Sequence, residues 1–178
     1  LFLIPGSALL EAQVRIGVVI DGVWDRNEGV QELFESEIRE LTAGEFDVQF
    51  PPEKNLVADW TVAGVDAALD QLLSDPEVDL VLAMGVIASN NVCRRTNLPK
   101  PVVAPFVLDA GVQGLPYKDG ASGVQNLSYV SLPSTFARDL HAFQEIVPFQ
   151  NVAILLNPPV MQAVPDILNN IRTVTDSL

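Results

Sequence analysis

The stretch VDLVLAM, residues 78–84, is apolar at nearly every position and is followed by Gly85. An almost unbroken apolar run of this length predicts a strand that is buried on both faces, as in a parallel sheet. Parallel strands need long crossover connections, and these are usually helices. The stretch therefore predicts an α/β fold with helices before and after it in the chain.

The sequence on both sides of this stretch alternates in the same way. Apolar residues at helical spacing predict helices, and Thr61 and Ser134 are expected to cap two of them, while Pro165 should kink or restart the last one. Repeated βα units predict a doubly wound parallel sheet with right-handed crossovers, in which ligands bind at the carboxyl ends of the strands. Further strands are expected at 14–20, 46–50, 101–107, 124–130 and 151–156, and helices at 27–41, 61–73, 88–95, 134–147 and 158–178.

The first strand and its turn read IGVVIDGVWDRNEG, residues 16–29. A phosphate-binding loop at this place would need a different glycine spacing, and the two acids Asp21 and Asp25 would repel a phosphate. A phospho-receiver domain would need an aspartate where Met84 and Gly85 stand. Neither a nucleotide site nor a phosphorylation site is predicted.

Catalytic residues are not apparent either. The single histidine, His141, falls inside a predicted helix, and no G-x-S-x-G nucleophile elbow is present. Asp21, Asp25 and Asp109 could form a carboxylate pair only in a geometry that the sequence does not supply, and Asp25 suits a turn or a helix cap. We therefore predict that the protein is not an enzyme and holds no metal or cofactor.

The charge composition disfavours some classes of binding partner. The 178 residues carry a net charge of −13, with only 10 scattered basic residues, which disfavours nucleic acid and anionic membrane surfaces. Cys93 is the one cysteine, and we expect a buried thiol. The apolar start, residues 1–13, is either the remnant of a signal peptide or a leading segment packed on the domain.

The remaining prediction is a cleft for a small molecule at the strand ends. Trp24 is either a wall for a ligand or a lid over the core, and Ser89 either helps the helix start to hold a carboxylate or caps the helix. The predicted ligand-binding residues are Asp21, Trp24, Gly85, Ser89, Phe106 and Asp109.

The order of these segments resembles the type I periplasmic-binding-protein fold. Within that fold the chain is most similar to a substrate-binding family of ABC transporters that includes tryptophan/tyrosine-binding-like proteins. The resembling segments are IGVVIDG (16–22), VDLVLAMGVIASNNV (78–92), KPVVAPFVLDAG (100–111) and NLSYVSLPSTFARDLHAFQEIVPFQNVAILLNPP (126–159). Relatives often have Gly-Thr where this chain has Gly85-Val86, which leaves the identity of the ligand open.

The resemblance implies a Rossmann-like first lobe over 14–130 and the start of a second, incomplete lobe over 131–178. It also implies a periplasmic or extracytoplasmic solute-binding protein that captures an amino acid or similar molecule between two lobes, for a membrane transporter. The alternative is a non-catalytic interaction or sensor module of a larger cell-envelope protein involved in export or efflux.

Overall fold

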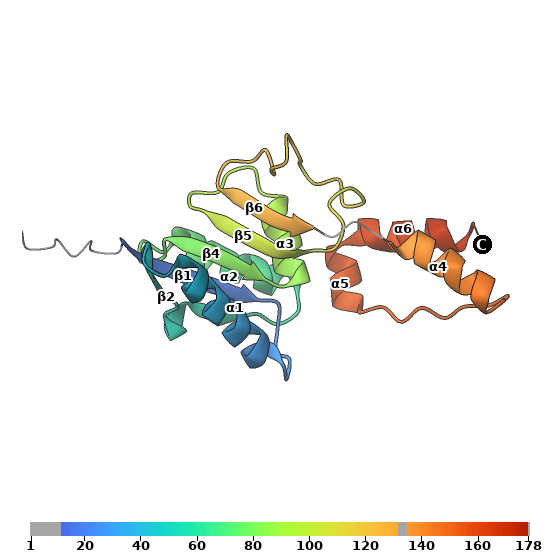
Figure 1. Ribbon diagram of the computed structural model, residues 1–178, viewed down its shortest axis with the longest axis horizontal. Helices are drawn as coiled ribbons and strands as arrows, with labels where there is room; N and C mark the ends of the chain where they lie inside the picture. The colour runs from blue at the N-terminus through green and yellow to red at the C-terminus, as the bar shows by residue number, and fades with distance from the viewer. Residues whose placement is uncertain (1–11, 132–134, 178) are drawn as a thin grey trace, which may run out of the picture.

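The computed structural model describes residues 12–131 and 135–177. A compact α/β unit is followed by a helical extension that projects from one end of the sheet (Figure 1). The α/β unit consists of β1 (Ala12–Ile20), α1 (Asn27–Thr42), β2 (Phe46–Gln49), the 3-10 turn η1 (Pro52–Lys54), β3 (Asn55–Val57), α2 (Val62–Ser74), β4 (Leu80–Met84), α3 (Val86–Cys93), β5 (Val102–Val107) and β6 (Leu127–Ser131). The extension consists of α4 (Phe136–Ile146), α5 (Pro158–Ala163) and α6 (Pro165–Thr175).

The sheet is parallel, with the strand order β2-β1-β4-β5-β6. The first half of β1 pairs with β2, and its second half pairs with β3, which is off this path. β2 and β3 therefore lie on one side of β1, and β4, β5 and β6 lie on the other. The order in which strands are added to the sheet reverses at β1. The predicted doubly wound, Rossmann-like α/β fold is confirmed.

Helices cover the two faces of the sheet unequally. On one face, α2 and α3 pack on Val19, Val81 and Ala83, which are all fully buried. On the other face, α1 packs through partly buried apolar residues on Val18 and Leu82. Alternation along β1 and β4 sends successive side chains to opposite faces, which is why these central strands read as continuous apolar runs.

Local signals in the sequence placed several element ends correctly. The Thr61 hydroxyl accepts a hydrogen bond from the Gly64 amide at 2.9 Å, so this predicted N-cap is confirmed. α5 ends at Ala163 and α6 begins at Pro165, as the proline predicted. The predicted cap Ser134 lies outside the described residues.

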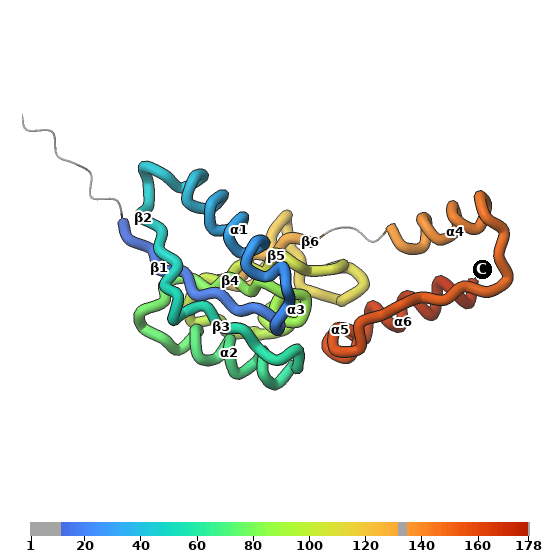
Figure 2. Tube along the Cα trace, turned by 90° about the horizontal axis from the view of Figure 1, so that it is seen from below, coloured from blue at the N-terminus to red at the C-terminus, as the bar shows by residue number. Residues whose placement is uncertain are grey.

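The strand predicted at 151–156 is wrong. The structure has no strand there, and Leu155 is 98% exposed. After β6 the chain leaves the sheet for the extension, and this segment runs between α4 and α5 away from every described strand (Figures 1 and 2). Apolar periodicity reports a tendency to be buried, but a strand also needs a neighbour with which to form hydrogen bonds.

The first strand begins before the end of the predicted leading segment, residues 1–13. Ala12 and Gln13 belong to β1 and pair with β2, so they are not part of a leading segment. Residues 1–11, where the signal-peptide remnant was expected, lie outside the described residues. In the part of the chain that the structure describes, no helix combines the length and apolar character that crossing a membrane requires.

Candidate ligand cavity

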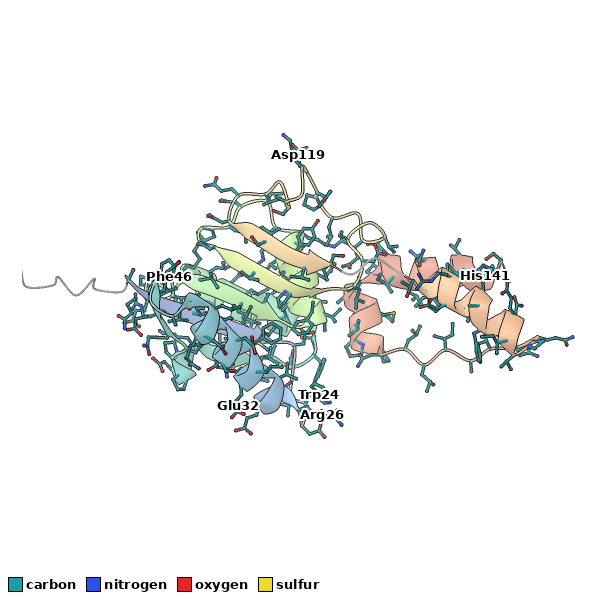
Figure 3. The ribbon with its side chains drawn as sticks, viewed as in Figure 1. Trp24, Arg26, Glu32, Phe46, Asp119 and His141 are labelled. Atoms are coloured by element: carbon teal, nitrogen blue, oxygen red, sulfur yellow. The ribbon has the colours of Figure 1, made fainter. Side chains whose placement is uncertain are left out.

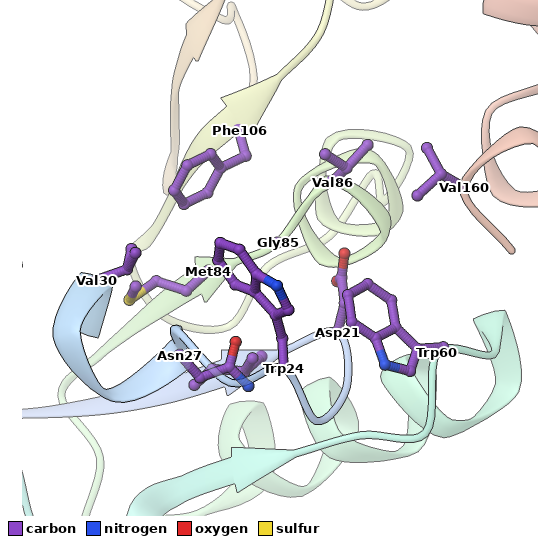
Figure 4. Close-up of a pocket in the computed structure, with 11 residues that line it drawn as sticks. Asp21, Trp24, Asn27, Val30, Trp60, Met84, Gly85, Val86, Phe106 and Val160 are labelled. Atoms are coloured by element: carbon purple, nitrogen blue, oxygen red, sulfur yellow. The ribbon is translucent and has the colours of Figure 1, made fainter. Parts of the chain in front are cut away.

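A cavity of about 320 Å³ opens at the carboxyl end of the sheet, between the α/β unit and α5. β1, β4 and β5 reach it with their last residues, as expected for a doubly wound sheet. Its lining is mostly apolar and aromatic: Ile20, Asp21, Trp24, Asn27, Val30, Trp60, Met84, Gly85, Val86, Phe106 and Val160 (Figure 4). Four of the six residues predicted for the site, Asp21, Trp24, Gly85 and Phe106, are among them.

Asp21 is a buried carboxylate that binds the start of α3. Its Oδ2 accepts a hydrogen bond from the Ile87 amide at 2.9 Å, and its Oδ1 accepts one from the Ala88 amide at 2.8 Å. These amides are among the donors that have no partner within a helix, so the carboxylate caps α3 from another strand. Burial raises the pKa of Asp21, and backbone hydrogen bonds from Ile87, Ala88 and Val86 act in the opposite direction.

Gly85 is required by the close approach of this carboxylate. A Cβ at Gly85 would lie 2.2 Å from the Asp21 carboxyl carbon, well inside contact distance. The backbone at Gly85 is extended, with a φ of 176°, so its conformation alone would admit any residue. Gly85 therefore lines the cavity because only a residue without a side chain leaves room for the Asp21 carboxylate.

The two tryptophans of the chain both line the cavity, although they come from different loops. Trp24 follows β1 and is 48% exposed. Trp60 precedes α2 and is half-buried, and sequence reasoning did not select it. In the view of Figure 4, Asp21 lies between the two indoles.

Trp60 is held by several contacts at once. Its indole N–H donates to the Val23 carbonyl at 3.2 Å, and its amide donates to the Asp21 carbonyl at 2.7 Å. A Cβ at Gly22 would lie only 2.3 Å from the Trp60 ring. Trp60 has a φ of 66°, a left-handed conformation that is rare for a bulky residue and is found mostly where the surroundings enforce it.

Ser89 is buried beneath the cavity and does not line it. Its hydroxyl donates to the Ala83 carbonyl at 3.0 Å and accepts from the Phe106 amide at 3.1 Å. It therefore joins β4 to β5 and positions Phe106, whose ring packs against Phe34 of α1 at a centroid distance of 5.7 Å. The Ser89 hydroxyl has these two partners, and neither is a ligand.

Asp109 also lies outside the cavity lining. Its Oδ1 accepts a hydrogen bond from the Val112 amide at 2.8 Å, and its own amide donates to Gln113 Oε1 at 2.9 Å. These contacts shape the turn that follows β5, which is a common use of aspartate.

The helical extension supplies one wall of the cavity through Val160 of α5. α5 is held against α3 by Asn90, whose Nδ2 donates to the Ala163 carbonyl at 2.9 Å. Asn90 Oδ1 accepts from Gln113 Nε2 at 2.8 Å, and Arg94 forms an ion pair with Asp166 of α6 at 2.6 Å. We call Asn90, Gln113, Arg94 and Asp166 the polar latch.

Within 12–131 and 135–177, His, Cys, Asp and Glu side chains form no group that could hold a metal ion. His141 is exposed on α4 in the extension, well away from Trp24 in Figure 3.

Comparisons with protein-family models, with curated proteins and with solved structures find no match to this chain. The resemblance to type I periplasmic binding proteins therefore stays a prediction.

Proposed function

We propose that the protein is a solute-binding protein that holds a small, largely apolar molecule in the cavity at the carboxyl end of its sheet. One observation carries the proposal: Trp24, Trp60 and Phe106, from three separate segments, line one cavity of about 320 Å³ together with a few polar groups. Concave, mostly apolar sites with a few polar groups are typical of small-molecule binding. Delivery to a membrane transporter remains the role that the family resemblance implies.

The construction of the cavity supports this proposal further. A half-exposed tryptophan at the mouth leaves apolar area that a ligand could cover. The strained backbone of Trp60 and the close approach of Gly22 hold a second indole at the same place. Such strain is concentrated at functional sites, because ordinary packing does not require it.

Thermal-shift and tryptophan-fluorescence measurements on the full chain test the proposal. A panel of small aromatic and aliphatic compounds should include some that raise the melting temperature and change the emission of the two cavity tryptophans. Trp24→Ala should weaken binding of those compounds about tenfold or more, in line with the loss of one aromatic contact in a partly enclosed site.

Phe46→Ala provides the matched control. Phe46 is 42% exposed, comparable to Trp24, but it begins β2 at the opposite end of the sheet (Figure 3). Its removal should leave binding unchanged. A panel without any response, or equal losses in Trp24→Ala and Phe46→Ala, would count against a ligand site at this cavity.

A second candidate function, a protein-interaction module, is favoured by a separate observation. Six large apolar residues in the second half of α4 and in the segment between α4 and α5 are exposed: Phe143, Ile146, Val147, Val152, Leu155 and Leu156. Contiguous exposed apolar surface often marks an interaction site. Sedimentation velocity should then show concentration-dependent association of the full chain that Leu155→Glu abolishes, whereas a strictly monomeric chain would speak against this function.

A further inference from the structure

We propose that the preferred ligand is an organic ammonium ion that carries an apolar or aromatic group and no carboxylate. The inference rests on the proposed function and adds the charge of the ligand to it.

The cavity offers a cation one carboxylate and several aromatic surfaces. Among the described residues that line it, Asp21 alone is charged. A carboxylate has about four acceptor positions, and backbone hydrogen bonds from Val86, Ile87 and Ala88 occupy three of them. Further acceptor capacity therefore remains on the Asp21 oxygens for an ammonium N–H.

The aromatic residues suit the same charge. An ammonium ion is attracted to the faces of tryptophan and phenylalanine rings, and aromatic cages bind such ligands. The indole N–H of Trp60 already donates to Val23, so this side chain can offer a ligand only its π surface. Trp24 and Phe106 add two more rings to the lining.

Charged residues around the cavity also favour a cationic ligand. Asp25 and Asp59 are exposed and directly follow or precede the two tryptophans in the sequence. The net charge of the protein, −13, also attracts cations rather than anions toward the cavity. Arg26 is exposed on the same loop but is absent from the lining, and in Figure 3 it lies at the outer tip of that loop with Trp24.

A ligand carboxylate would not find matching hydrogen-bond donors at the start of α3. In a doubly wound sheet, an anion would bind the amides at the start of a helix. At α3 the amides of Ile87 and Ala88 already donate to Asp21, and the Ser89 hydroxyl is bonded to β4 and β5. Asn27 also lines the cavity, and its Nδ2 already donates to the Gly22 carbonyl at 2.8 Å. A carboxylate in the cavity would therefore meet a negative charge and mostly apolar walls, so an amine is favoured over an amino acid.

Four matched compounds separate these contributions by isothermal titration calorimetry at low salt and pH 7.5. Phenethylamine carries the ammonium alone, phenylalanine carries the ammonium and a carboxylate, 3-phenylpropanoate carries the carboxylate alone, and 2-phenylethanol carries neither. We expect phenethylamine to bind about tenfold more tightly than 2-phenylethanol, and both carboxylates to bind more weakly than their counterparts without one.

The same four compounds distinguish two kinds of failure. If 2-phenylethanol binds as tightly as phenethylamine, or phenylalanine binds more tightly than phenethylamine, the charge preference is overturned while the cavity remains a ligand site. If none of the four binds or changes tryptophan emission, both this inference and an aromatic-binding function are overturned.

Asp21→Asn tests the role of the carboxylate directly. The variant keeps the shape of the side chain and removes its charge, so the advantage of phenethylamine over 2-phenylethanol should fall to within about threefold. Circular dichroism checks that the variant is folded, and the wild-type series decides the inference if it is not. An unchanged advantage in a folded Asp21→Asn protein would refute a role for the carboxylate.

Discussion

The carboxylate of Asp21 occupies the space that a side chain at Gly85 would need. The two residues directly follow adjacent strands, since Ile20, the last residue of β1, pairs with Met84, the last residue of β4. A Cβ at Gly85 would come within 2.2 Å of the Asp21 carboxyl group, whose oxygens bind α3. Asp21, Gly85 and the start of α3 therefore pack together as one unit, and Asp21 and Gly85 line the cavity.

Gly85→Ala should destabilise the protein because the added methyl group collides with Asp21. Overpacking of a buried site costs about 1–3 kcal/mol, and displacing Asp21 also removes hydrogen bonds to a buried carboxylate. We expect a loss of about 3 kcal/mol in the free energy of unfolding, measured by urea denaturation.

Gly29→Ala is the matched control for this substitution. Gly29 lies in the first turns of α1, and a Cβ there would meet no atom within 4 Å other than its chain neighbours and the backbone of its own helix. Alanine is the better helix former, so this variant should gain about 0.5–1 kcal/mol. Losses of equal size in the two variants would show that the cost is not specific to the contact with Asp21.

Much of this arrangement could be predicted from the sequence, because short stretches of neighbouring residues mark where each strand ends. Asp21, Gly85 and Phe106 follow or end apolar runs, and the carboxyl ends of parallel strands share one edge. Ser89 was misleading because a hydroxyl near a helix start suits a ligand and a neighbouring strand equally well. Its partners, Ala83 and Phe106, depend on how β4 and β5 lie beside α3.

Trp60 and Val160 could not be found in this way. Trp60 lies between the short strand β3 and the start of α2. β3 has only three residues and follows soon after Pro51 and Pro52, so no apolar run in the sequence predicts a strand there. Val160 reaches the cavity only because the polar latch holds α5 against α3. Contacts between segments far apart in the sequence leave no local pattern, although the scarcity of tryptophan was a signal that could have drawn attention to Trp60.

Asn90→Ala should loosen the extension while leaving the α/β unit folded. The substitution removes the hydrogen bond to the Ala163 carbonyl and leaves the buried amide of Gln113 without its acceptor, at a cost of about 2–3 kcal/mol. Hydrogen exchange measured by mass spectrometry should show faster exchange over 158–175.

Asn91→Ala serves as the control for the polar latch. Asn91 is the next residue of α3, but its side chain bonds Asp66 and Arg95 instead of α5. Exchange over 158–175 should be unchanged in this variant. If Asn90→Ala also left that exchange unchanged, the latch would not be what holds α5 in place.

The ion pair between Lys54 and Asp75 should make stability depend on pH in the acid range. Lys54 Nζ lies 2.7 Å from Asp75 Oδ2, and its hydrogen bond lowers the pKa of Asp75 below the ordinary value of 3.8. A lowered pKa in the folded state means that the contribution is complete above about pH 3.8 and is lost as the pH falls through the lowered value.

Lys54→Met removes this contribution. The difference in the free energy of unfolding between wild type and variant should be constant near neutral pH and should shrink as the pH falls below about 4. Lys118→Met, at an exposed lysine of the loop before β6, should show no such trend. A wild-type advantage that persists undiminished at pH 2 would contradict the ion pair as its source.

Cys93 should be almost unreactive in the folded protein. The thiol is 2% exposed at the end of α3, and burial raises its pKa from 9.0 to about 12. Because the thiolate is the reactive form, a rise of this size leaves about a thousandfold less of it at pH 8. Limited access slows the reaction further.

A thiol reagent such as 5,5′-dithiobis(2-nitrobenzoic acid) measures this difference. At pH 8 the native chain should react at least a thousandfold more slowly than the chain unfolded in guanidinium, and the residual rate should report opening of α3 from the sheet. Gly85→Ala, which disturbs the start of α3, should therefore react faster than wild type. A native rate within tenfold of the unfolded rate would show that Cys93 is accessible and that α3 does not protect it.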